Sequence, residues 1–227
     1  MNFSTFLAAA ALATFPCEGT VAETLLCADG EVAIESADRA LSLRVCSVVE
    51  RARPLLNACH LYQSSPIVLQ VGDHGTSLIH GCMGTYDPKT ETIRVSDPGT
   101  LTDIVSAETF MGRMSAEKLF ESLVVHELSH GFLKQTAEQR ALCLVDHEYT
   151  AYAIQLSWLD AQEPGAVDRL LGDIKDKDVS YLNDFIALAA PDLFAKAVWA
   201  HFSASENGCA FIGQLVSGHA SLYRESN

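Results

Sequence analysis

Two histidines and a glutamate stand close together in the segment His126-Glu127-Leu128-Ser129-His130, with the spacing of a metal site. If the segment is helical, His126 and His130 project from the same face about 6 Å apart, so both imidazoles can bind one tetrahedral zinc ion. Glu127 is turned by about 100° from His126 and can reach a water molecule in the open coordination position. Zinc lowers the pKa of such a water toward about 7 and polarises a carbonyl group, while a glutamate can take and return the proton. The segment therefore predicts metal-assisted hydrolysis with Glu127 as the general base.

The neighbours of this segment favour a buried helix. Ser115 is a candidate N-cap, and the residues between and beside the two histidines carry no charge apart from Glu127. A stray charge would be costly to desolvate beneath an active site. The alternative is a helix with two ordinary histidines, because the bare pattern arises by chance in roughly 1–2% of chains of this length and composition.

A zinc ion needs a third protein ligand, and the chain offers Glu148. The extended metzincin pattern is absent, because Leu133 and Thr136 stand where it requires glycine and the third histidine, three and six residues after His130. Residues 141–159 have helical spacing, and Glu148 is an acid in their apolar stripe. A lone carboxylate that faces a core is normally paired or bound to metal, so Glu148 is the predicted third ligand. Asp146 and His147 are the alternative ligands, and an exposed Glu148 that pairs with Arg or Lys is the structural alternative.

HELSH at 126–130, followed by EYTAY at 148–152, resembles the gluzincin group of zinc metallopeptidases. The resemblance covers roughly residues 66–160 and is closest to the small exported bacterial proteins with this zincin-like core. It implies that two histidines and a glutamate bind Zn²⁺ and that peptide bonds are cleaved. The residues around Glu148 (VDHEYT) differ from the asparagine or small-residue pattern of larger gluzincins, so the groups that support the ligands should differ too.

The resemblance also implies two further parts of a peptidase site. An edge strand of the small sheet is expected to hold an extended peptide by main-chain pairing. A tyrosine or histidine from the helical portion is expected to stabilise the oxyanion, although Tyr152 could instead hold Glu148 by a hydrogen bond. The candidates for the oxyanion donor are Tyr149, Tyr152, Tyr181, His201 and His219.

The rest of the pattern predicts an α+β fold that positions these groups. Residues 36–59 have helical spacing, with Pro54 as a possible end or kink. Residues 66–71 read as a strand, and residues 81–86 and 92–95 as a hairpin around the turn sequence DPKT. From Ser115 the spacing is helical almost to the end. The expected order is a helix, a small sheet and then a helical portion.

The start of the chain and its cysteines predict export. Residues 3–15 are an uncharged apolar run of signal-peptide length, and small residues precede an expected cleavage after Ala22. Cleavage would remove Cys17 and leave six cysteines, enough for up to three disulfides. The alternatives are a buried N-terminal helix and six cytosolic thiols. No later segment is long and apolar enough for a membrane span.

These features combine into one predicted zincin-like domain at 23–227, after a signal peptide at 1–22. Residues 23–114 would form its helix and sheet portion, and residues 115–227 its helical portion with the metal site. The predicted function is an exported, periplasmic or secreted zinc hydrolase that acts on a peptide or protein. A net charge of −14 disfavours a nucleic-acid partner. The alternatives are a non-catalytic binding protein with this fold and a disulfide-stabilised structural or interaction domain.

Overall fold

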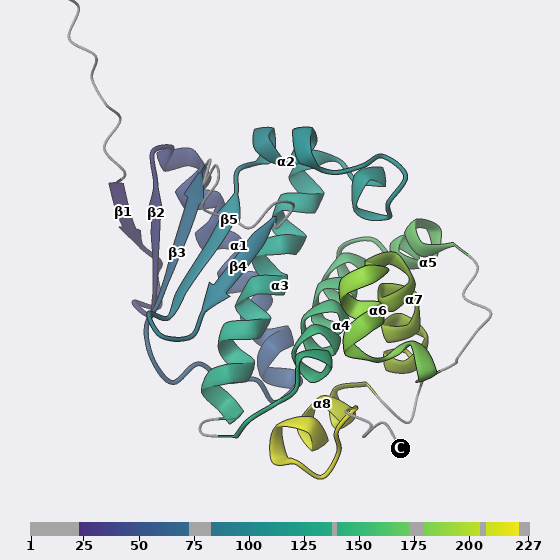
Figure 1. Cartoon of the computed structure of the whole chain (residues 1–227). Helices are drawn as coiled ribbons and strands as arrows, with labels where there is room; N and C mark the ends of the chain where they lie inside the picture. Colours follow the sequence, from purple (N-terminus) through teal and green to yellow (C-terminus); the bar gives the residue numbers. More distant parts are fainter. Residues whose placement is uncertain (1–22, 73–82, 138–139, 173–178, 205–207, 223–227) are drawn as a thin grey trace, which may run out of the picture.

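A five-stranded sheet and a group of helices make up the computed structural model, which describes residues 23–72, 83–137, 140–172, 179–204 and 208–222. The strand order is β1-β2-β3-β5-β4 (Figure 1). The strands are β1 (Glu23–Leu26), β2 (Val32–Ser36), β3 (Ile67–Gly72), β4 (Gly84–Asp87) and β5 (Thr92–Ser96). The three inner strands are parallel, whereas β1 and β4 pair antiparallel at the two edges. Among the described residues, β4 is therefore an edge strand, paired with β5 and with no other strand.

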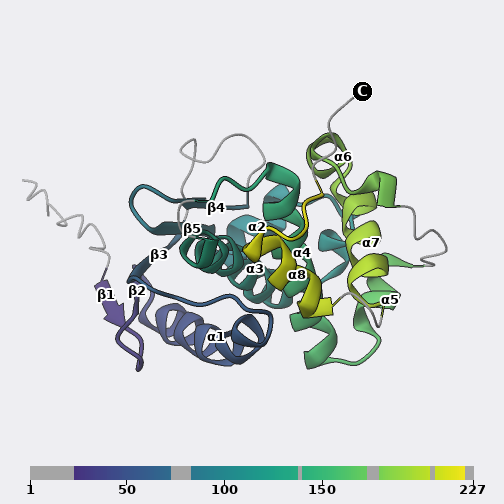
Figure 2. The ribbon, with the colours of Figure 1, turned by 90° about the horizontal axis from the view of Figure 1, so that it is seen from below.

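Two long helices cover one face of this sheet. Helix α1 (Arg39–Ala58) packs on β2, helix α3 (Ala116–Ala137) packs on β4 and β5, and the two helices contact each other (Figure 2). The inward side chains of β3, Ile67, Leu69 and Val71, are buried in the core that this packing creates. The alternation along β3 thus gives the sheet one apolar face for the helices.

Helix α3 lies between the sheet and the helical portion of the chain (Figure 1). Helix α4 (Leu144–Gln162) packs closely along it, and the remaining helices extend this layer. Because α3 is covered from both sides, its buried residues surround the whole axis rather than one stripe. The shorter helices are α2 (Pro98–Ile104), α5 (Ala166–Leu171), α6 (Asp184–Ala189), α7 (Pro191–Phe202) and α8 (Gly208–Ser217), with 3₁₀ turns at Met111–Arg113 and Val179–Tyr181.

The α+β class expected from the sequence is confirmed, but three elements were not anticipated: β1, β2 and α2. The first two form a hairpin before α1, so the described part of the chain begins with two strands rather than with a helix. α1 itself starts after Asp38, whose carboxylate accepts hydrogen bonds from the amides of Ala40 and Leu41. The helix continues past Pro54 to Ala58, so this proline does not end it. Ser115 accepts a hydrogen bond from the amide of Lys118, as expected of an N-cap for α3.

Two disulfides tie these layers together. Cys27–Cys46 joins the end of β1 to α1, and Cys59–Cys209 joins the end of α1 to α8. Cys143 is a thiol among the described residues, whereas Cys82, Cys17 and the expected signal peptide lie outside them. Disulfides of this kind are typical of oxidising, extracytoplasmic compartments. No helix in the described part of the chain has the length and apolar character needed to cross a membrane.

The two disulfides should differ in their effect on stability. Cys59–Cys209 spans 150 residues and Cys27–Cys46 spans 19. Loop-closure entropy then predicts that Cys59→Ala/Cys209→Ala lowers the free energy of unfolding by up to about 5 kcal/mol, against about 3 kcal/mol for Cys27→Ala/Cys46→Ala. Urea unfolding of both double variants would measure this. A larger loss from the shorter loop would contradict the entropic argument.

Candidate metal centre

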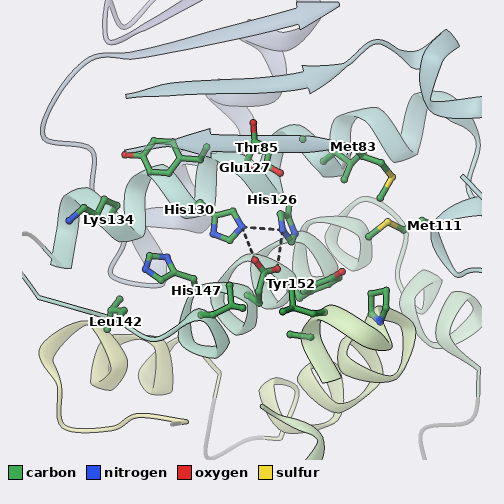
Figure 3. A pocket seen from close by; sticks show the side chains of 18 of the residues that line it. Met83, Thr85, Met111, His126, Glu127, His130, Lys134, Leu142, His147 and Tyr152 are labelled. Carbon is green, nitrogen blue, oxygen red and sulfur yellow. Dashed lines mark hydrogen bonds and ion pairs between the residues drawn. The ribbon is translucent and has the colours of Figure 1, made fainter. Parts of the chain in front are cut away.

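Three side chains from two helices converge on one point. α3 supplies His126 and His130 (Figure 3), and α4 supplies Glu148. The Nε2 atoms of the two histidines are 3.2 Å apart, and the Glu148 oxygens lie 3.7 Å from His126 Nε2 and 3.6 Å from His130 Nε2. All three ligand atoms lie within 4.8 Å of one another, so this buried group could bind a metal ion.

A hydrogen-bonded chain fixes the orientation of His126. The Ser122 hydroxyl donates to the Leu119 carbonyl (2.8 Å), so Ser122 Oγ accepts from Gln155 Nε2 (3.1 Å). The amide oxygen of Gln155 must then face His126 Nδ1, at 3.0 Å. Because that oxygen only accepts, the proton of His126 lies on Nδ1. The lone pair on Nε2 is thereby directed into the cluster, as a metal ligand requires.

Burial keeps both histidines neutral at pH 7. It lowers the pKa of His126 to about 4. The pKa of His130 lies well below its ordinary value because of burial and the neighbouring His126 and His147. Burial also raises the pKa of Glu148 to about 7. The Nε2 atoms of two neutral imidazoles and the Glu148 carboxyl group thus face one another, and a cation among them would stabilise the ionised carboxylate.

Glu127 is buried beside the cluster, against strand β4. A Cβ atom on Gly84 would lie 2.6 Å from Glu127 Oε1, so glycine at that position lets the strand lie directly against the carboxylate as it stands here. Burial and the charge of Glu148 raise the pKa of Glu127 well above its ordinary value. Glu127 therefore lies where it can exchange protons with a group bound at the cluster.

A cavity of about 920 Å³ opens over these residues. His126, Glu127, His130 and Glu148 line it, and residues 84–86 of β4 form part of its wall. The close-up shows Lys134 and His147 on one side of the cluster, with Met83 and Met111 on the other (Figure 3). The cluster thus lies within a cleft bounded by an edge strand.

A family model described as "Family of unknown function (DUF6639)" matches residues 32–225. The chain belongs to this family. No curated protein and no solved structure matches the chain. The DUF6639 match includes both helices of the cluster and the strand that lines the cleft, so the whole candidate site lies within the family region.

The other candidate ligands lie apart from the cluster. Asp146 is buried and accepts hydrogen bonds from the Ser221 hydroxyl and the Leu222 amide, which holds the C-terminal segment against α4. His147 lines the cleft with its ring centroid 6.1 Å from that of His130, but it is not one of the three clustered residues.

Of the oxyanion candidates, only Tyr152 lines the cleft. Its ring lies edge-on to His126, with the centroids 4.9 Å apart. Tyr149 is buried, and its hydroxyl is 2.7 Å from His201 Nδ1, so these two groups are paired with each other. His219 lies near the Ser217 hydroxyl, and Tyr181 belongs to a 3₁₀ turn.

Gln155 and Gly84 are the residues of the site that sequence reasoning missed. Gln155 follows Glu148 by seven residues and therefore shares its helical face, which was a usable signal. A glycine in an expected strand indicates a close approach, but the sequence does not say of which group.

Replacing Gln155 should weaken metal binding without removing a ligand. Gln155→Leu leaves the His126 Nδ1 proton without its acceptor, and loss of such a partner typically costs about 10- to 100-fold in metal affinity. Gln155→Glu restores the acceptor and should recover most of the affinity. The measurement is zinc affinity by chelator competition, with Gln162→Leu, near the end of the same helix, as the control. Equal affinities for Gln155→Leu and the wild type would contradict the role of this residue.

Gly84→Ala should displace Glu127. The added methyl group meets the end of a flexible side chain, so the carboxylate should move while the fold and the three clustered side chains remain in place. A shift of about 1 Å in a catalytic group can cost about 100-fold in turnover. Gly72→Ala in β3 is the matched control, because nothing lies within 4 Å of its added carbon. Turnover and zinc content would be measured together, and unchanged turnover for Gly84→Ala would argue against a catalytic Glu127 at this position.

Proposed function

We propose that this protein is an exported zinc-dependent peptidase. The observation that supports it best is the convergence of His126, His130 and Glu148 within 4.8 Å, beside a buried glutamate in a cleft. Two neutral imidazoles and one carboxylate are a ligand set typical of catalytic zinc, which leaves a coordination position for water. The two disulfides and the signal-like segment at 1–22 support an oxidising, extracytoplasmic location.

The roles of the chain's own residues follow from their positions. Zinc held by the three ligands would activate water and polarise the scissile carbonyl. Glu127 takes the proton of the attacking water and returns it to the leaving amine. The outer edge of β4, which pairs with no strand in the part of the chain that the structure describes, holds the substrate main chain beside the cluster. Tyr152, which lines the cleft with its ring edge-on to His126, supplies the hydroxyl that stabilises charge on the carbonyl oxygen in this proposal.

The test is zinc content by elemental mass spectrometry, combined with cleavage of a broad peptide library. About one zinc per chain is expected from this ligand set, with hydrolysis that a chelator abolishes and added zinc restores. Zinc without any cleavage would indicate a non-catalytic binding protein. A protein that takes up no zinc on titration would overturn the proposal in favour of a structural domain.

A further inference from the structure

The two ends of the cleft differ in chemistry. On one side of the cluster, Met83 and Met111 line the cleft (Figure 3), and the lining also includes the apolar Val105 and Leu123. Two of these residues are methionines, whose flexible side chains adapt to differently shaped apolar groups. This end is therefore suited to an apolar side chain.

The opposite end is basic. Lys134 near the end of α3 and Arg140, whose amide donates to the Ala137 carbonyl, both line the cleft there. Asp192 is the one acid in the described lining besides Glu127 and Glu148, and it belongs to the apolar end, where it accepts a hydrogen bond from the Phe110 amide. Two cations in one part of the cleft contrast with the net charge of −14 of the whole chain.

The rim of the cleft carries exposed apolar side chains. Ile104 and Leu188 line the cleft and are 45% and 73% exposed, and Phe185 on the same helix as Leu188 is 74% exposed. A small polar ligand would leave these groups in water, whereas an extended chain with apolar residues would cover them.

We infer that the substrate is an extended peptide with an apolar side chain at the Met83 and Met111 end and an acidic side chain at the Lys134 and Arg140 end. The scissile bond would lie between the two. This inference rests on the proposed function, because it concerns the substrate of the same cleft. A peptide with a basic residue beside Lys134 and Arg140 would be repelled, so these two cations select against such peptides.

The test uses zinc-loaded Glu127→Gln, so that binding is measured without cleavage. The probes are fluorescent decapeptides with a central phenylalanine and a Glu-Glu or Lys-Lys pair placed either before or after it. With the charged pair on one side of the phenylalanine, the Glu-Glu peptide should bind about tenfold more tightly than the Lys-Lys peptide. High salt should reduce this ratio of affinities. Adding Lys134→Glu or Arg140→Glu to this protein should bring the ratio close to one. Lys118→Glu, on the same helix but paired with Glu163 outside the cleft, should preserve it. Replacing the phenylalanine by serine should weaken binding about tenfold.

Failure of the inference and failure of the proposed function give different results. Equal binding of Glu-Glu and Lys-Lys peptides in both orders would overturn the inference, as would the absence of any peptide binding. If the charge preference is found but wild-type protein cleaves none of the bound peptides, the inference stands and the peptidase proposal fails. If wild-type protein cleaves acidic and basic peptides equally well, the peptidase proposal stands and the inference fails.

Discussion

Glu127→Gln should abolish peptide hydrolysis while the protein keeps its zinc. Glu127 is not one of the three clustered ligands, and glutamine has nearly the same shape, so the packing against Gly84 is retained. The amide cannot accept and return a proton, and general-base catalysis contributes about 10²- to 10⁴-fold. Turnover should fall by about that factor, with zinc content measured on the same sample.

Glu121→Gln is the control for this prediction. Glu121 lies on the same helix but outside the cleft, where it pairs with Arg44 and Arg51. Its loss should leave turnover unchanged. Persistent hydrolysis in zinc-loaded Glu127→Gln would exclude the proposed proton transfer.

The same variant has a thermodynamic signature that does not depend on a substrate. The folded-state pKa of Glu127 is raised well above the ordinary 4.5 by burial and by Glu148, so the unfolded chain ionises first as the pH rises. This carboxyl therefore lowers the stability of the metal-free fold progressively above about pH 4.5, until the folded pKa is passed. Glutamine does not titrate. Metal-free Glu127→Gln should melt at a higher temperature than the wild type at pH 8, and at nearly the same temperature at pH 4.

The parts of the site that the sequence could predict are those set by helical periodicity. The spacing of His126 and His130 places them on one face of α3, and the apolar stripe around Glu148 turns that acid toward them. Both inferences need only the period of a helix. The helical period also separates Glu148 from Asp146, which is two residues earlier on α4 and turns toward the C-terminal segment instead.

The parts of the fold and of the site that the sequence could not predict depend on contacts between elements far apart in the chain. Gly84 contacts Glu127 where β4 packs on α3, and no local sequence pattern predicts which strand packs on that part of the helix. The strand order is equally non-local, because β5 lies between β3 and β4. The missed strand β2 did carry a weak signal, since the β-branched residues Val32 and Ile34 stand two positions apart, the spacing of one strand face, and both are buried. The four residues of β1 are mostly exposed and carry almost none.

Glu148→Ala should lower zinc affinity by more than about 1,000-fold, because it removes one of three ligands and leaves two imidazoles on a single helix. The Tyr152 ring and the Gln155 hydrogen bond still hold His126, so the fold should persist. Chelator competition at pH 7.5 would measure the loss. Full zinc occupancy in this variant would mean that another residue is the third ligand, with His147 the nearest alternative in the cleft.

The pH dependence of zinc binding distinguishes a carboxylate ligand from a structural acid. In the metal-free protein, the pKa of Glu148 is raised to about 7, whereas that of His126 is lowered to about 4 and that of His130 lies well below its ordinary value. Between pH 7 and pH 5 the proton that zinc must displace is therefore the one on Glu148. Wild-type affinity should fall about tenfold for each pH unit in this range, and the weaker affinity of Glu148→Ala should stay nearly constant. Equal slopes in the two proteins would show that the displaced proton belongs to another group, and Glu148 would then lose its role as the third ligand.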